Sequence, residues 1–228
     1  YKIRVKGTSP NEEAMDDKGY VPLISEADIR FTQESPFIGE TRLGVDPSGE
    51  GQDVTSWVAR DNFKLKVLGK ELISHPKTIA VKTMTWMTEL NVRDTDVMLD
   101  NFGSGADVSK EMALSDFRYN IGTVNVGQSA DDDIYLNLRA EAYFRFRNWL
   151  RTGGLIIDNP LGRELAKELL SIKYRRNEAG KIQIMPKQEM RKQGIASPNH
   201  ADAGMLTFVL PPKVKNPYPQ TQGVKPFY

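Results

Sequence analysis

Apolar residues recur along much of the chain with the spacing of amphipathic helices. Ile79, Ala80, Met84, Met87 and Leu90 recur at helical spacing, which predicts a helix over residues 76–90. We also expect helices over residues 106–114, 135–151 and 161–171, and the glycine pair at 153–154 suits the end of the third. A last helix is predicted from Ser197, as its N-cap, towards the proline pair at 211–212.

Shorter apolar runs bounded by turn residues predict strands. These runs cover residues 2–5, 42–46, 54–60, 63–73, 96–100 and 121–126, and a small helix is expected near residues 26–32. A tight turn at residues 61–62 joins two of the strands into a meander, and residues 172–176 and 181–185 read as a hairpin. A meander followed by alternating helices and strands indicates an α/β sandwich with a mixed sheet.

The amino-acid composition limits the kinds of structure and site that the chain can form. The chain has 39% hydrophobic and 27% charged residues, as a globular protein does, and no apolar run long enough to span a membrane. It has no cysteine and two histidines, which excludes disulfides, thiolate metal sites and a histidine-rich zinc centre. Residues 1–138 carry 15 Lys/Arg against 23 Asp/Glu, whereas residues 139–228 carry 16 against 7. This division suggests metal ligands in the first part and polyanion contacts in the second, unless it is a scatter of solvated charge.

The last predicted helix carries an acidic residue where packing disfavours one. Asp202 precedes Met205 and Leu206 by three and four residues, so it shares their apolar stripe. With Pro198 as the first helical residue, Asp202 is expected past the first turn, where the helix dipole helps it less. A carboxylate facing a core needs a hydrogen bond, a cation or a metal to compensate it.

Two further acids end predicted strands, Asp46 after residues 42–45 and Asp100 after residues 96–99. The ends of neighbouring strands and a flanking helix can converge on one point, and hard cations such as Mg²⁺ and Mn²⁺ prefer oxygen ligands. Asp46 and Asp100 could instead serve the glycine-containing turns that follow them. Asp53 and Asp107, after glycine loops, are expected to cap the elements that they precede.

Three motifs occur in a fixed order: GVDPSGEGQD at 44–53, VMLDNFGSG at 97–105 and SPNHADA at 197–203. Together with NLRAE at 137–141, Glu168, the hairpin, Lys187 and GIASP at 194–198, they resemble the nuclease domain of tailed-phage terminase large subunits. The resemblance covers nearly the whole chain apart from the tail. One departure is Asn199, where many members of that family have Asp.

The resemblance implies an RNase H-like mixed β-sheet flanked by helices, with an auxiliary β-hairpin. It implies a connector from an ATPase domain at residues 1–40, the nuclease domain at residues 41–212 and a flexible Pro/Lys-rich tail at residues 213–228. It further implies an endonuclease that uses two Mg²⁺ or Mn²⁺ ions, held by Asp46, Asp100 and Asp202, to cut concatemeric viral DNA during genome packaging. The expected partners are double-stranded DNA, the ATPase domain, the portal and the small terminase subunit, in the host cell cytoplasm and not in the mature virion.

Basic residues near the hairpin are the predicted DNA contacts, because a cutter of many sites needs phosphate contacts more than base readout. They are Arg175, Arg176, Lys181, Lys187, Arg191 and Lys192; Arg139, Arg145 and Arg147 are further candidates. His200 is expected to face solvent. Two other functions stay open: a Holliday-junction resolvase of the same fold, or a catalytically silent RNase H-like module that docks on DNA or a portal.

Overall fold

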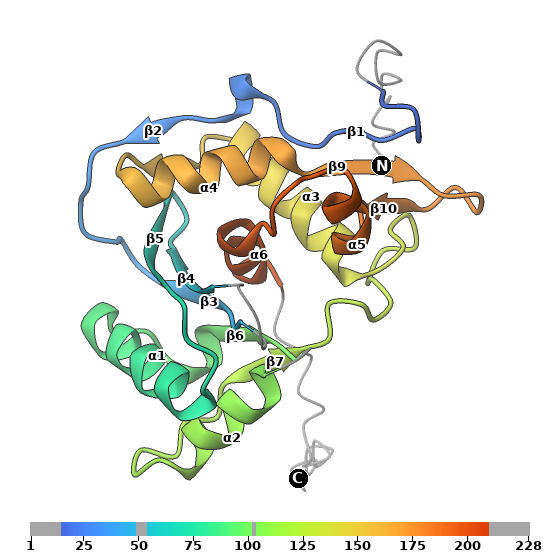
Figure 1. Ribbon diagram of the computed structural model, residues 1–228. Coiled ribbons are helices and arrows are strands. Elements are labelled where there is room, and N and C mark those ends of the chain that lie inside the picture. Colours follow the sequence, from blue (N-terminus) through green and yellow to red (C-terminus); the bar gives the residue numbers. More distant parts are fainter. Residues whose placement is uncertain (1–14, 49–53, 102–103, 210–228) are drawn as a thin grey trace, which may run out of the picture.

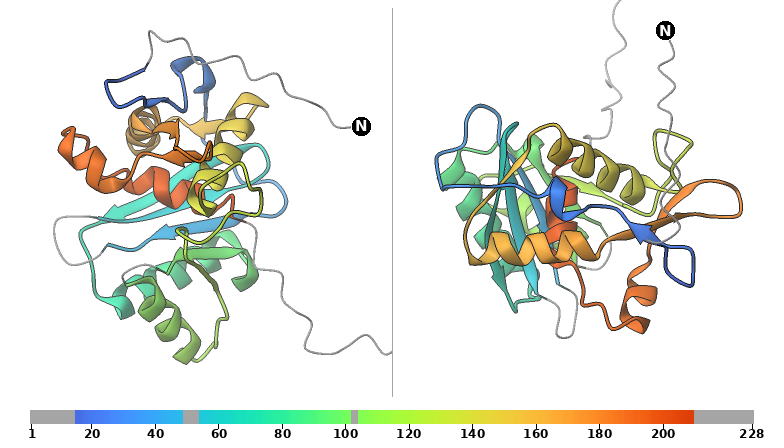
Figure 2. Two further views of the ribbon diagram at one scale, coloured as in Figure 1. Left: turned by 90° about the vertical axis from the view of Figure 1, so that its right-hand side faces the viewer. Right: turned by 90° about the horizontal axis from the view of Figure 1, so that it is seen from above.

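The computed structural model describes residues 15–48, 54–101 and 104–209. A seven-stranded sheet lies between two layers of helices, and a second sheet of three strands stands at one end (Figures 1 and 2). The strands are β1 (Val21–Pro22), β2 (Phe31–Thr32), β3 (Arg42–Asp46), β4 (Thr55–Arg60), β5 (Lys64–Glu71), β6 (Val97–Asp100), β7 (Gly122–Val124), β8 (Leu155–Ile157), β9 (Lys173–Arg176) and β10 (Ile182–Ile184). The helices are α1 (Pro76–Leu90), α2 (Gly105–Leu114), α3 (Leu138–Arg151), α4 (Pro160–Ser171), α5 (Lys187–Lys192) and α6 (Asn199–Leu206), with 3₁₀ turns at Glu26–Asp28 and Asp94–Asp96.

The large sheet is mixed, with the order β2-β8-β5-β4-β3-β6-β7. Strands β3, β4 and β5 form the predicted antiparallel meander. On either side of it, β6 and β7, and β8 and β2, add as parallel strands. The predicted α/β fold with a mixed sheet flanked by helices is confirmed.

The two faces of this sheet carry different helices (Figure 2, left). Leu43 and Val45 of β3, with Val97 and Leu99 of β6, are buried in one apolar cluster with residues of α1 and α2. The alternate residues face α3, α4 and α6, where Met98 joins the other cluster. This alternation follows from the two-residue period of a strand.

Helix α6 lies against the second face, and all eight of its residues are buried. Gly44 in β3 makes this close approach feasible. A Cβ at Gly44 would stand 2.0 Å from the carbonyl oxygen of Ala203, which no side chain could tolerate. The helix that carries Asp202 therefore lies directly over the strand that ends in Asp46.

The predicted hairpin is confirmed as β9 and β10, and β1 pairs with β9 to complete the small sheet. Residues from the segment expected to be a connector thus enter both sheets, and Tyr20, Leu23 and Ile24 belong to the core. The division into connector, domain and tail stays a prediction, since residues 1–14 and 210–228 lie outside the described residues. No helix in the described ranges is long and apolar enough to cross a membrane.

Several details differ from the sequence-based expectations. Strands β1, β2 and β8 and the short helix α5 were not predicted. The last helix begins at Asn199, with Pro198 as its N-cap, and it ends at Leu206 instead of continuing towards the prolines. Asp202 therefore lies in the first turn of α6, not past it.

Candidate metal and DNA site

The three acids singled out from the sequence line one cavity of about 460 Å³. Asp46 and Asp100 come from the carboxyl ends of β3 and β6, and Asp202 comes from the first turn of α6. The hairpin and α5 complete the wall, together with α3 and the loop after β7. The polar residues that they contribute are Asn125, Asn137, Arg139, Gln183 and Lys187.

Asp46 and Asp100 are neighbours because β3 and β6 run parallel in register. Val45 pairs with Leu99, so the next residue of each strand is an aspartate on the face covered by α6. Burial, together with the charges of Asp202 and Asp100, raises the pKa of Asp46 to about 7 against the opposing effects of Lys187 and Arg139. At Asp46, burial and the two neighbouring carboxylates thus outweigh the effect of the two cations.

Asp202 has the opposite balance. The Tyr143 hydroxyl donates to its Oδ1 at 2.7 Å, and Arg139 Nη2 donates to the same oxygen at 3.1 Å. Lys187 Nζ forms an ion pair with Oδ2 at 2.8 Å. Burial alone would raise the pKa of Asp202, but Arg139 and Lys187 outweigh it and hold the pKa well below its usual range.

Oxygen donors of this kind suit a hard divalent cation, which would offset the repulsion that Asp100 and Asp202 exert on Asp46. In the arrangement seen within the described ranges, however, no three His, Cys, Asp or Glu side chains are grouped closely enough to share an ion. Lys187 places a cation 2.8 Å from Oδ2 of Asp202, a buried oxygen that accepts no hydrogen bond. The donor chemistry fits a metal, provided that Lys187 yields its place on Asp202.

The start of α6 is anchored by buried polar contacts that the sequence did not reveal. His200 is 1% exposed, and its Nδ1 lies 2.7 Å from Ser56 Oγ on β4, so the expectation that it faces solvent is wrong. The backbone N–H of Ala201 donates to Glu168 Oε2 at 2.8 Å. Burial raises the pKa of Glu168 to about 8. Asn199 is buried beside these residues.

Asp107 does not contribute to this geometry. Asp107 forms an ion pair with Lys110 at 2.9 Å on the surface of α2 and does not line the cavity. Asp53 lies outside the described residues.

The predicted DNA contacts lie at the cavity, on α5 and on the hairpin. Lys187 lines the cavity, while Arg191 and Lys192 are exposed on α5. Arg176 is exposed at the end of β9, and Lys181 lies 3.7 Å from Asp133 at the hairpin. Of these five residues, Lys187 alone is part of the described lining of the cavity, and the DNA contacts of the others stay a prediction.

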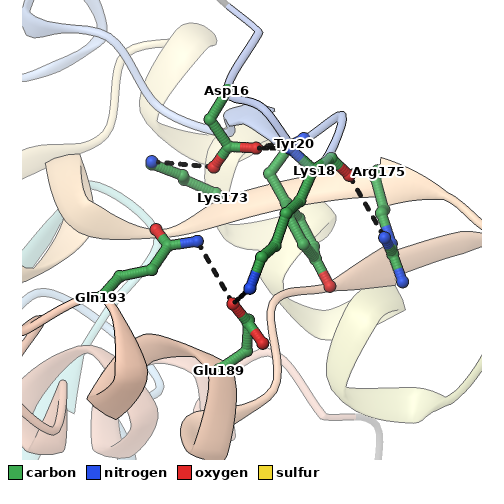
Figure 3. Close-up of polar contacts among 7 residues, drawn as sticks. All are labelled: Asp16, Lys18, Tyr20, Lys173, Arg175, Glu189 and Gln193. Atoms are coloured by element: carbon green, nitrogen blue, oxygen red, sulfur yellow. Dashed lines mark hydrogen bonds and ion pairs between the residues drawn. The ribbon is translucent and has the colours of Figure 1, made fainter.

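Arg175 and Arg139 are engaged inside the protein. The guanidinium of Arg175 lies 4.6 Å from the centre of the Tyr20 ring and donates to the carbonyl of Lys18 at 3.2 Å (Figure 3). Arg139 is directed at Asp202 and at the carbonyl of Met185. Neither role could be read from a basic residue in the sequence alone.

No family model and no curated protein matches the sequence. Solved structures do match. The nuclease domain of the large terminase subunit gp2 of bacterial virus Sf6 aligns with a TM-score of 0.65 at 21% identity, over 82% of this chain and 98% of that one. The chain has the fold of a phage terminase nuclease domain. The resemblance inferred from the sequence is confirmed at the level of the fold, which is RNase H-like.

Two further terminase nuclease structures were solved with metal ions. A point mutant of the Sf6 domain with calcium matches at a TM-score of 0.65 and 23% identity, over 75% of this chain and 88% of that one. The large terminase nuclease from thermophilic phage G20c with bound cobalt matches at a TM-score of 0.58 and 11% identity, over 82% of this chain and 96% of that one.

Proposed function

We propose that this chain is a divalent-metal-dependent DNA endonuclease of the terminase type, with Asp46, Asp100 and Asp202 as its metal ligands. The observation that supports it best is that these three carboxylates, from β3, β6 and α6, line one cavity. The fold, shared with terminase nuclease domains that were solved with calcium or cobalt, supports the same conclusion.

The proposed cofactor is a pair of Mg²⁺ or Mn²⁺ ions. Bound there, they would activate a water molecule and neutralise the leaving oxygen of a phosphodiester. The protein's own part is positioning. Tyr143 and Arg139 fix the orientation of the Asp202 carboxylate, and Lys187, whose side chain is 40% exposed, presents a cation at the cavity.

The proposed substrate is double-stranded DNA, cut from concatemers during viral packaging in the host cytoplasm. Arg176, Lys181, Arg191 and Lys192 would contact phosphates around the cavity. From the same likeness to terminases, the proposed partners are an ATPase domain, a portal and a small terminase subunit. The likeness to solved domains of large terminase subunits supports this assignment.

The test is nicking of supercoiled plasmid by the purified protein, with Mn²⁺ or Mg²⁺ and with EDTA. We expect cutting that depends on either ion and is poorly supported by Ca²⁺, whose longer and looser coordination does not align the reactants. Nicking that survives EDTA would overturn the metal mechanism. Cutting confined to branched DNA would favour a junction resolvase instead.

A catalytically silent docking module is the second candidate. The neutralisation of Asp202 by Arg139 and Lys187 favours it, because a carboxylate that is already paired gains less from a cation. The absence of nicking under every metal condition, with DNA binding retained, would select this function.

A further inference from the structure

A polar cluster away from the cavity joins the first described residues to α5 (Figure 3). We call it the brace; it consists of Asp16, Lys18, Tyr20, Lys173, Arg175, Glu189 and Gln193. Its members come from the turn before β1, from β9 and from the α5 region. It therefore ties three segments that are distant in sequence.

The turn itself has a well-defined conformation. Asp16 Oδ1 accepts from the backbone N–H groups of Lys18 at 3.1 Å and Tyr20 at 2.9 Å, and Gly19 takes a φ of 76°. The other carboxylate oxygen of Asp16 pairs with Lys173 at 3.1 Å. With Tyr20 only 2% exposed beneath Arg175, the turn cannot shift without losing these contacts.

Lys18 extends from this turn to α5. Its Nζ lies 2.5 Å from Glu189 Oε1, and Gln193 donates to the same oxygen at 3.4 Å. Lys187, which begins α5, lies two residues before Glu189. Two residues correspond to about 200° around a helix, so the two side chains leave α5 on nearly opposite sides. Helix α5 is thus held between the turn and Asp202.

We propose that Lys18 and Glu189 are positioning residues of the candidate site, acting through α5 to keep Lys187 on Asp202. This inference rests on the proposed function for its effect on metal binding, but not for its effect on α5. When the brace is loosened, Lys187 leaves Asp202 more readily, and the positive charge that competes with a metal ion at Oδ2 of Asp202 is removed. A partner or segment that displaces the turn would then favour metal binding.

The experiment is a charge-reversal cycle: Lys18→Glu, Glu189→Lys and the double variant. The first readout is hydrogen–deuterium exchange of residues 187–192, and the second is Mn²⁺ affinity by calorimetry. Each single reversal should speed exchange and tighten Mn²⁺ binding by roughly two- to fivefold, the size expected for a partly exposed ion pair, and the double variant should restore both. In a Lys187→Gln background the effect on Mn²⁺ affinity should vanish.

The matched control is the ion pair between Lys82 of α1 and Glu71 of β5, which has the same length of 2.5 Å and does not contact α5. Reversal of Lys82 should leave both readouts unchanged. Unaltered exchange at residues 187–192 in both single reversals would overturn the brace, as would an effect on Mn²⁺ affinity that persists without Lys187. A wild-type protein that never nicks DNA would refute the proposed function, while the exchange data would still decide the brace.

Discussion

The two faces of the large sheet are built from the same strands, but one is apolar near β3 and β6 while the other carries carboxylates there. Toward α1 and α2, strands β3 and β6 present Leu43, Val45, Val97 and Leu99, all buried among apolar partners. Toward α6 the alternate positions end in Asp46 and Asp100. One face gains stability from burial alone, whereas the other holds charge that must be compensated.

The compensation on the α6 face is uneven, and this unevenness is informative. Asp202 has two cations and a tyrosine hydroxyl around it, while burial leaves Asp46 with a pKa of about 7. In a purely structural ion pair, each charged group is neutralised by its partner. A cluster of carboxylates in which one pKa is raised strongly and another is lowered strongly is typical of a functional site.

The largest expected effect is on cutting. Asp46→Asn, Asp100→Asn and Asp202→Asn should each lower plasmid nicking by at least about a thousandfold, because each removes an anionic ligand while keeping nearly the same shape. Circular dichroism should show an intact fold. Full activity in any one of the three variants would remove that residue from the proposed metal site.

The apolar face should respond in the opposite way. Ile79→Ala in α1 removes a fully buried side chain and should lower the free energy of unfolding by about 2–5 kcal/mol. Nicking per folded molecule, measured well below the melting temperature, should stay near the wild-type value. A loss of activity as large as that of the Asp variants would show that the two faces are not functionally separate.

A third effect is a pH-dependent stability of the metal-free protein. Folded Asp46 keeps its proton up to a pKa of about 7, against an ordinary value of 3.8. Between these values the native state binds more protons than the unfolded state, so Asp46 lowers the free energy of unfolding as pH rises. Asp46→Asn should remove this loss. Its free energy of unfolding should exceed that of wild type by on the order of 2 kcal/mol at pH 8, with little difference at pH 4.

The measurement for this third effect is thermal unfolding of both proteins in EDTA at the two pH values. An equal difference in melting temperature at pH 4 and pH 8 would contradict the raised pKa.

The smallest effect concerns DNA binding. The double variant Arg176→Ala/Lys181→Ala should weaken binding to all duplexes alike and flatten the salt dependence by about one unit per lost phosphate contact. Lys77→Ala/Lys110→Ala, on the exposed surfaces of α1 and α2, is the matched control. Binding isotherms at several salt concentrations separate the two. Equal slopes for both variants and wild type would place the DNA elsewhere.

Much of the fold was predictable because its signals are local. The sequence predicted α1 and β3 with the bounds that the structure has, and the meander and hairpin follow from apolar runs and turn residues. Strand β8 was missed because it has three residues, too few to show alternation, and its pairing with β5 and β2 decides its state. The six-residue helix α5 is likewise too short to show a helical period.

For the candidate site, the sequence by itself determined which carboxylates end β3 and β6 and that Asp202 shares an apolar stripe. Tertiary structure alone decided that Arg139 and Tyr143 of α3 and Lys187 of α5 meet at Asp202, and that His200 is buried against Ser56. The physical reason is that local pattern specifies an element and the face it buries. The counter-charge of a buried group comes from whichever distant element packs against it, and only the assembled fold determines that partner.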